Sequence, residues 1–517
     1  MGMVALFLLL APLLVLINKA AWLVFSAYCL NPIGIQKMMA KQGVSGPRPS
    51  FLTGNLQHIA TLLAKTTSSD MVEITHDIVP RLLPHYLSWS EKYGERFLFW
   101  YGNEGRLCLT DANLIKDFLS SKHAHVTGRS WLQLQGSKHL IGRGLIMANG
   151  DDWFQQRRII APMFMGFKIK AFMGYVVEST KSMLRSIHDV AGDGTECEVE
   201  IGAYMTKLTG DVISRAGFGS SYEKGTRIFQ LLQKLQYLTA QSSRHLWFPG
   251  ARFFPSKFHR EIKTVKEEMK SILMETIKKR IEGLEIGRIC SSDSDFLGTI
   301  LRETQEDPKK KMTLELIMDE CKTIYFAGHE SSAMLVTWTV MLLATNPAWQ
   351  HKARKEVGEI FKGESAVTAD HLSKLNLLNM IINESLRLYP PVAMLPRMAF
   401  QDIKLGDSLH IPKGLSVWIP VLAIHHSKEI WGDDADEFNP ERWSGKSPAQ
   451  IGNFLPFAGG PRNCLGQAFA VMEAKIILSM LIAQFSFKIS DKYRHAPINV
   501  LTLRPKHGVP IILTPIK

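Results

Sequence analysis

The sequence predicts a mainly α-helical protein with small β-sheets, built as one large domain behind an N-terminal transmembrane helix. An apolar run opens the chain, helical periodicity dominates the remaining residues, and pieces rich in β-forming residues are short and far apart. A length of 517 residues would allow about three domains of average size. Because neither an internal repeat nor a second linker divides the chain, we expect a single large domain.

The first expected element is a membrane anchor over residues 1–30. Residues 3–17 and 20–30 are apolar, and together they exceed the roughly 20 residues that a helix needs to cross a bilayer. Positive charges such as Lys19 and Lys37 follow the run and none precedes it. This order favours a retained anchor, with the rest of the chain in the cytosol, over a cleaved signal peptide.

A linker is expected next, over residues 31–55, because the stretch 43–55 is rich in Gly and Pro and cannot continue a helix. Residues 56–517 then form the large domain. Its amphipathic helical runs lie at 83–93, 204–216, 225–240, 257–284 and 313–345. Its β-rich pieces lie at 96–100, 106–110, 416–419 and 509–513.

Composition narrows the classes of partner. A hydrophobic share of 46% with 21% charged residues excludes a disordered chain. Lys and Arg number 61 against 48 Asp and Glu, and the net charge of +13 favours nucleic acid, acidic lipid, an acidic protein or a phosphorylated ligand as partner. The six cysteines form no CxxC pair, which argues against a zinc ribbon or a disulfide framework.

One cysteine lies in a loop suited to a metal-bearing cofactor, FAGGPRNCLG. Backbone N–H groups of this glycine-bracketed loop can stabilise the thiolate of Cys464, and Phe457 can pack beside the sulfur. Gly460 and Gly466 leave room for a flat cofactor, while Arg462 can pair with a carboxylate on it. A single thiolate suits iron already held by a macrocycle better than zinc or an iron–sulfur cluster.

This loop resembles the F-x-x-G-x-R-x-C-x-G haem loop of the cytochrome P-450 family, the haem-thiolate monooxygenases, at all five fixed positions. The resemblance implies the cytochrome P-450 fold, haem b with Cys464 as axial iron ligand, and hydroxylation with O₂. Since no glycine loop for a dinucleotide is visible, we expect electrons from an NADPH-dependent flavoprotein reductase. We also expect single-pass insertion in the endoplasmic reticulum membrane, contact with membrane lipid, and no nucleic-acid partner.

A second motif lies in the long helical run and reads AGHESS. A glycine inside a helix costs about 1 kcal/mol, so Gly328 needs a reason such as close approach by a ligand or a local opening. The motif resembles the family's oxygen-activation motif, with Glu330 as acid and Ser331 as alcohol in a proton relay. Serine replaces the usual threonine, which predicts looser coupling. Ala333 excludes the zinc-protease motif HExxH.

Further residues match the family at the cofactor's carboxylates. Trp153 and Arg157 match its W-x-x-x-R, and together with Arg397 and Arg462 they are expected to hold the haem propionates. Arg129 is a weaker candidate.

A structural network is expected elsewhere, in which Glu384 and Arg387 lie on one helix face and meet Arg442. Removing one partner would strand a buried charge.

Longer stretches resemble plant cytokinin trans-hydroxylases; they lie at 142–153, 244–263, 316–332, 387–400, 415–427 and 494–509. This implies hydroxylation of the isopentenyl side chain of an isopentenyladenine nucleotide to the trans-zeatin type. A nucleotide would need cations, for which Arg244 and Arg504 are candidates, and apolar walls, for which Met394, Leu395 and Leu501 are candidates. The alternatives are hydroxylation of a fatty acid or another hormone, a haem-thiolate isomerase or dehydratase, and a non-catalytic haem-binding protein.

Overall fold

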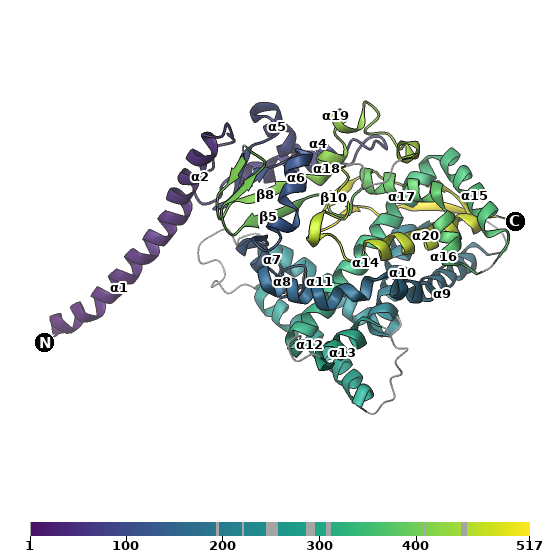
Figure 1. The fold of residues 1–517 in the computed structure, drawn as a ribbon, viewed down its shortest axis with the longest axis horizontal. Helices are drawn as coiled ribbons and strands as arrows, with labels where there is room; N and C mark the ends of the chain where they lie inside the picture. The colour runs from purple at the N-terminus through teal and green to yellow at the C-terminus, as the bar shows by residue number, and fades with distance from the viewer. Residues whose placement is uncertain are drawn as a thin grey trace.

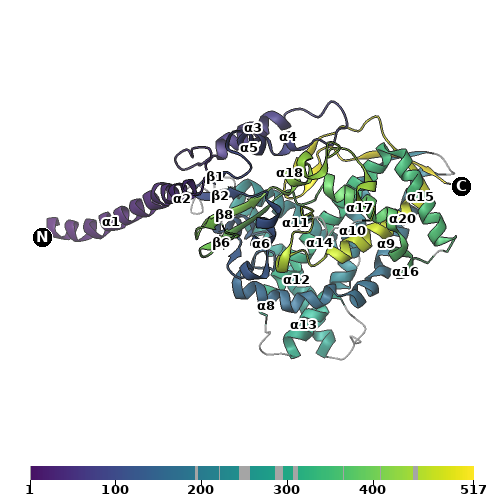
Figure 2. The same cartoon turned by 45° about the horizontal axis from the view of Figure 1, so that its top comes forward.

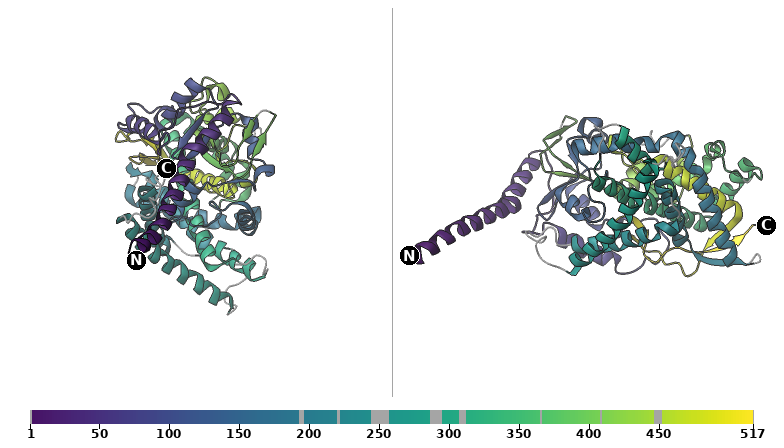
Figure 3. Two further views of the ribbon diagram at one scale, coloured as in Figure 1. Left: turned by 90° about the vertical axis from the view of Figure 1, so that its left-hand side faces the viewer. Right: turned by 90° about the horizontal axis from the view of Figure 1, so that it is seen from below.

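A helical body with small sheets follows a projecting N-terminal helix, and the two chain termini lie at opposite ends of the molecule (Figures 1 and 3). The computed structural model describes residues 2–192, 196–219, 222–243, 257–285, 295–306, 312–364, 366–407, 409–445 and 452–516. The arrangement confirms the mainly α-helical class with small β-sheets.

The element order agrees closely with the expected helical and β-rich runs. The helices are α1 (Gly2–Phe25), α2 (Asn31–Ala40), α3 (Leu56–Thr67), α4 (Val79–Leu82), α5 (Pro84–Tyr93), α6 (Ala112–Phe118), α7 (Trp131–Ser137), α8 (Gly150–Ile160), α9 (Gly166–Ala191), α10 (Ile201–Phe218), α11 (Tyr222–Ser243), α12 (Lys257–Glu285), α13 (Phe296–Glu306), α14 (Leu314–Thr345), α15 (Pro347–Phe361), α16 (Ala369–Lys374), α17 (Asn376–Leu388), α18 (Val421–His425), α19 (Lys428–Trp431) and α20 (Gln467–Gln484). The strands are β1 (Leu98–Tyr101), β2 (Glu104–Cys108), β3 (Thr127–Gly128), β4 (Cys197–Glu200), β5 (Leu395–Ala399), β6 (Ile403–Leu405), β7 (Leu409–Ile411), β8 (Ser416–Ile419), β9 (Phe485–Ile489), β10 (Pro497–Asn499), β11 (Leu503–Pro505) and β12 (Pro510–Pro515).

Helix α14 runs through the middle of the helical half and packs against α10, α17 and α20 (Figure 1). It begins at an N-cap, where the hydroxyl of Thr313 accepts the N–H of Leu316 at 3.2 Å. From Leu335 to Ala344 every residue is buried. A helix that is apolar on all sides belongs in a core, so α14 forms the axis around which the other helices pack.

The largest sheet has the order β1-β2-β8-β5-β3 and lies at the end of the body from which α1 and α2 leave (Figure 2). Strands β2 and β8 pair in parallel, and the other neighbours are antiparallel. Strand β8 lies at the centre and all four of its residues are buried, which explains why its sequence, SVWI, does not alternate. β-rich pieces far apart in the sequence therefore meet in one sheet.

The N-terminal helix continues further than the expected anchor boundary at residue 30. A π-helical turn, Ser26–Leu30, joins α1 to α2, so helix extends to Ala40 through residues assigned to the linker. Pro32 lies in the first turn of α2, where a missing N–H is tolerated. The exposed helical segment Pro12–Ala40 is long and apolar enough to cross a membrane. Helix α20 meets the same criterion but is largely buried in the core.

The connector after α2 lies against the sheet. The carbonyl of Ser45 accepts the N–H of Leu98 at 2.9 Å, and the N–H of Asn55 donates to the carbonyl of Trp100 at 2.7 Å. A Cβ atom on Gly46 would lie 1.8 Å from the carbonyl oxygen of Leu98, so only glycine fits this close approach. The connector is therefore fixed along β1.

A fully buried carboxylate joins α17 to the segment after α19. The two oxygens of Glu384 accept from Nε and Nη2 of Arg387 at 2.9 and 2.8 Å. Glu384 also accepts from Nε of Arg442 at 3.4 Å and from the indole N–H of Trp443 at 2.9 Å. Arg387 donates its remaining hydrogens to backbone carbonyls, among them Ala435 at 2.6 Å. The structure thus brings Glu384, Arg387 and Arg442 together.

We predict that Arg387→Met lowers the free energy of unfolding by about 3–5 kcal/mol, because Glu384 would keep its charge in a buried site without its main partner. Denaturant titration followed by circular dichroism measures this. The matched control is Lys355→Met, since Lys355 forms an exposed pair with Glu359 at 3.9 Å on the neighbouring helix α15 and should not alter stability measurably. Equal midpoints for the two variants would contradict the prediction.

Candidate functional site

Cys464 lies between the short 3₁₀ turn Gly460–Arg462 and helix α20. Its N–H donates to the carbonyl of Phe457 at 2.9 Å, which closes the loop. Burial of the loop raises the pKa of the Cys464 thiol, while the N–H of Gly466 and the charge of Arg157 act in the opposite direction. The side chain of Cys464 is nevertheless exposed, whereas those of Cys108, Cys197 and Cys321 are buried. Its sulfur is therefore available to a ligand.

The two glycines of this loop differ in their roles. At Gly460, which has a φ of 66°, a Cβ would lie 1.7 Å from the carbonyl oxygen of Leu119. The backbone of Leu119 therefore requires a glycine here for its own close approach, and room for a cofactor beside Gly460 stays a prediction. At Gly466 a Cβ would meet only Phe164 and the sulfur of Cys464, at 3.8 and 3.9 Å. Gly466 thus leaves space beside the sulfur, and Phe457 is half-buried against the helical core.

Three arginines gather near the loop without a carboxylate among the described residues to pair with them. Arg129 follows β3, Arg397 lies in β5, and Arg462 ends the 3₁₀ turn. Burial and the charges of Arg397 and Arg157 lower the pKa of Arg462 to about 9, and burial lowers that of Arg397 to about 10. The pKa of Arg129 is lowered by burial and by the other two charges. Within the same described residues, Nη2 of Arg462 is buried without a hydrogen-bond partner.

This arginine cluster fits the carboxylates of haem. Arg397 is buried, and Arg129 and Arg462 are half-buried. Cations shielded from water in this way are costly without a partner, and an anionic group bound among them would reduce that cost. Backbone carbonyls fix their orientation: Arg129 Nε donates to Ile146 at 2.9 Å, and Arg462 donates to Ala124 and Ala148 at 3.1 Å each. The guanidinium of Arg462 also lies 4.2 Å from the ring centre of the buried Trp153.

Arg157 takes a different position from the other expected propionate ligands. Its Nη1 and Nη2 donate to the backbone carbonyl and the side-chain oxygen of Asn463, at 2.9 and 2.6 Å. Arg157 therefore holds the residue that precedes Cys464, and a contact with a propionate stays a prediction. Asn463 carries no sequence signal for this role, because the contact joins segments 306 residues apart.

The AGHESS motif lies within α14, which is helical without interruption over this stretch. A Cβ on Gly328 would lie 2.6 Å from Cδ1 of Ile213. Glycine is needed there because α10 packs closely against α14. The helix shows no local opening at this point, and close approach by a ligand stays a prediction. The hydroxyl of Ser331 donates to the carbonyl of Ala327 at 2.6 Å.

Glu330 is held by the C-terminal strands. Its Oε1 accepts from the hydroxyl of Thr502 at 2.5 Å and from Nη2 of Arg504, and its Oε2 accepts from Nε2 of Gln236 at 3.4 Å. Sequence reasoning placed Glu330 in the proton relay and Arg504 at a substrate phosphate. The structure instead pairs the two charges, so the cation of Arg504 is already neutralised, which argues against a phosphate role.

The other expected substrate residues are spread over several elements. Leu395 begins β5 and is buried, while the sulfur of Met394 accepts the indole N–H of Trp418 at 3.3 Å. Leu501 lies in the turn between β10 and β11 and is 46% exposed. Arg244 lies outside the described residues. Leu395 is thus buried, Met394 is half-buried and Leu501 is exposed, and contact of any of them with a substrate stays a prediction.

Sequence reasoning missed one buried acid close to the thiolate loop. Glu473 lies on α20, and neither of its oxygens has a hydrogen-bond partner among the described residues. Burial raises its pKa to about 8, although the nearby Ser332 acts in the opposite direction, so the carboxyl is mostly protonated at neutral pH. The only signal in the sequence is an acid within the apolar run that forms α20.

Comparisons with known proteins agree with this geometry. Residues 81–510 match the family model of cytochrome P450. Two proteins of Arabidopsis thaliana, both named cytokinin hydroxylase, are similar: one is 55% identical over 95% of each chain, and the other is 54% identical over 95% of this chain and 94% of its own. Cytochrome P450 734A1 of the same plant is 36% identical over 93% of this chain and 92% of its own.

The family match covers most of the chain and includes the thiolate loop, the arginine cluster and the motif on α14. The fold expectation and the haem b expectation are thereby confirmed, and the N-terminal apolar helix is typical of membrane-anchored members of the family. The chain belongs to the cytochrome P450 family and is a haem-thiolate monooxygenase, which acts on a small molecule with electrons from a redox partner.

Proposed function

We propose that this enzyme hydroxylates the isopentenyl side chain of an isopentenyladenine-type cytokinin nucleotide, which yields the trans-zeatin type. The observation that carries the proposal is the identity of 55% and 54%, over nearly the full length, to two proteins named cytokinin hydroxylase. Identity to cytochrome P450 734A1 is only 36%. A large gap in identity favours the cytokinin substrate over a fatty acid or another hormone.

Cofactor binding follows from the geometry of the loop and the arginines. Cys464 would be the axial ligand, and Arg129, Arg397 and Arg462 would hold the propionates, with Trp153 packed against Arg462. When bound, the haem supplies a thiolate-ligated iron that activates O₂ for insertion into a C–H bond. Each guanidinium is held by a backbone carbonyl, so the arginine cluster would present donors in fixed positions to the carboxylates of the bound haem.

Proton delivery is assigned to Glu330 and Ser331. The ion pair with Arg504 and the hydroxyl of Thr502 hold the Glu330 carboxylate on the side of α14 that faces the β10–β11 hairpin. The hydroxyl of Ser331 donates within its own helix, so it must rotate before it can donate to a ligand. The side chain of serine rotates more freely about χ1 than that of threonine. Its hydroxyl can therefore take several orientations, and only some of them would deliver a proton to a ligand.

The electron donor and the location complete the proposal. An NADPH-dependent flavoprotein reductase with an acidic surface fits a chain with a net charge of +13. Pro12–Ala40 would cross the endoplasmic reticulum membrane once, with lipid around it and the catalytic body in the cytosol. The connector fixed along β1 would hold the sheet end of the body toward the bilayer.

The function is tested with the full-length protein in microsomes. We expect a carbon-monoxide difference spectrum typical of thiolate-ligated haem, and conversion of isopentenyladenosine 5′-monophosphate to the trans-hydroxylated product with reductase and NADPH. A thiolate spectrum without turnover of any isopentenyladenine form would contradict the cytokinin substrate and favour a different one. Absence of the thiolate spectrum in folded, haem-loaded protein would contradict the assignment of Cys464.

We predict that Arg462→Leu weakens haem retention, because a charge-assisted hydrogen bond is worth about 1.5–3 kcal/mol and each 1.4 kcal/mol is a factor of about ten. Haem loss to apomyoglobin should be about tenfold faster than in the unchanged protein. Arg158→Gln is the control, since Arg158 is exposed on α8 and makes no ion pair within the described part of the chain. Identical rates for both variants would exclude a propionate role for Arg462.

We predict that Ser331→Ala lowers the amount of hydroxylated product per NADPH consumed and raises hydrogen peroxide correspondingly, because the relay loses its hydroxyl. Ser331→Thr should raise coupling above that of the unchanged enzyme, because the β-branched side chain has fewer rotamers. Both quantities are measured in the same reconstituted assay. The relay role of Ser331 fails if the alanine variant couples as well as the threonine variant.

A further inference from the structure

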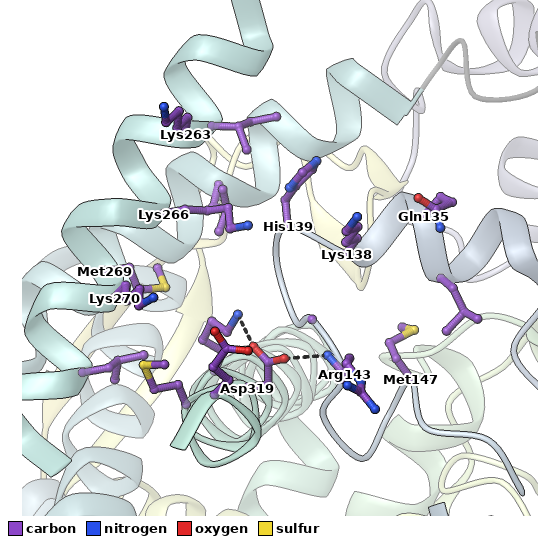
Figure 4. A pocket seen from close by; sticks show the side chains of 18 of the residues that line it. Gln135, Lys138, His139, Arg143, Met147, Lys263, Lys266, Met269, Lys270 and Asp319 are labelled. Atoms are coloured by element: carbon purple, nitrogen blue, oxygen red, sulfur yellow. Dashed lines mark hydrogen bonds and ion pairs between the residues drawn. The ribbon is translucent and has the colours of Figure 1, made fainter. Parts of the chain in front are cut away.

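A basic recess lies between α12, the start of α14 and the loop after α7 (Figure 4). Its volume is about 870 Å³, which lies in the range of small-molecule sites, about 300–1,000 Å³. Lys263, Lys266 and Lys270 enter from α12, and Lys138 and His139 from the loop opposite (Figure 4). We call this feature the lysine recess.

Three cations of the lysine recess have no ion-pair partner in the part of the chain that the structure describes. Lys322 pairs with Asp319 at 2.5 Å, Lys263 lies 3.9 Å from Glu267, and Arg143 lies 3.8 Å from Asp152. The remaining charged side chains that line the recess are Lys138, Lys266, Lys270 and Glu315. Once the charges of these three ion pairs are set against each other, the ammonium groups of three lysines remain with a single carboxylate, that of Glu315. The recess therefore keeps a net positive charge where a ligand would enter.

The same side chains repel one another. The pKa of Lys266 is lowered by partial burial and by the charges of Lys322 and Lys138. Burial, Lys266 and Lys138 lower the pKa of His139 to about 4, so this imidazole is neutral at physiological pH. An anion between α12 and the loop would relieve this repulsion. A neutral His139 could at the same time donate a hydrogen bond to it.

The stretch 142–149 forms one wall of the lysine recess, and its backbone also holds two members of the arginine cluster. The stretch 142–149 lies tightly on α14, because a Cβ at Gly144 would be 2.0 Å from Oγ1 of Thr323. The carbonyls of Ile146 and Ala148 in this stretch accept from Arg129 and Arg462. Along α14, nine residues separate Asp319 from Gly328, about 14 Å at 1.5 Å per residue. The lysine recess and the AGHESS motif thus lie on the same helix, about two and a half turns apart.

We propose that the lysine recess binds the phosphate of the nucleotide substrate, with Lys138, Lys266 and Lys270 as its ligands. This inference rests on the proposed function and names the phosphate subsite. Met147, Met269 and Leu235 supply apolar wall for the sugar and base. The phosphate would thus bind between α12 and the loop after α7. Arg504 is not its ligand in this proposal, because it already pairs with Glu330.

Two variants and a matched control test the subsite with the haem-loaded, full-length enzyme. Lys266→Gln should raise KM for isopentenyladenosine 5′-monophosphate about threefold, and Lys138→Gln with Lys266→Gln about tenfold, as expected for exposed charge pairs that add. KM for free isopentenyladenine and kcat for both should not change. Lys278→Gln is the control, because Lys278 is exposed on the same helix outside the recess. Equal effects on nucleotide and free base would overturn the subsite.

A second readout does not depend on turnover. Lysine acylation mapped by mass spectrometry should show that adenosine 5′-monophosphate protects Lys138 and Lys266 but not Lys278. Protection by phosphatidylserine vesicles and not by the nucleotide would overturn the proposal in favour of a lipid headgroup. If no cytokinin is turned over while protection by the nucleotide persists, the function fails and the phosphate site stands. Turnover of the nucleotide without protection overturns the site alone.

Discussion

Buried charge that the chain cannot neutralise by itself is the constraint on which the haem site depends. Arg129, Arg397 and Arg462 come from three separate segments, and none of them meets a carboxylate within the described residues. Cations shielded from water oppose folding unless they are paired, so an anion bound among these three arginines would stabilise the fold. The buried pair of Glu384 and Arg387 differs from the arginine cluster, because here the chain itself supplies both the cation and the carboxylate. The guanidinium of Arg387 also donates to backbone carbonyls.

The same principle links α14 to the C-terminal hairpin. Glu330 lies partly buried in the helix, and its charge is balanced by Arg504, 174 residues further along the chain. The residue proposed to carry protons is therefore positioned by β11, and Leu501 at the neighbouring turn is exposed. Any displacement of this turn would also alter the environment of Glu330, because Thr502 and Arg504 both donate to its carboxylate.

Local signals sufficed for most elements, and the resemblance of the loop around Cys464 to the family's haem loop sufficed for the family and its cofactor. Helical periodicity predicted α10, α12 and α14 to within a few residues, and the spacing around Cys464 predicted the iron ligand. Contacts across long separations were not visible in the sequence. The carbonyl of Leu119 explains Gly460, Ile213 explains Gly328, and Asn463 takes the guanidinium of Arg157. In each case the motif in the sequence singles out the residue, but the physical reason for it is a contact with a segment far away in the chain.

The boundary of the anchor shows the limit of composition as a guide. Residues 31–40 contain Pro32 and Gly34, which favour a linker, yet they extend the helix because a proline in a first turn costs little and the flanking residues are good helix formers. Met39, in the last turn of α2, and Val44, in the connector after it, are buried in the core of the large sheet. The end of α2 and the connector after it are thus packed into the sheet that carries Arg397. The segment proposed to cross the membrane is therefore joined to the catalytic body through this sheet, and not through a free linker.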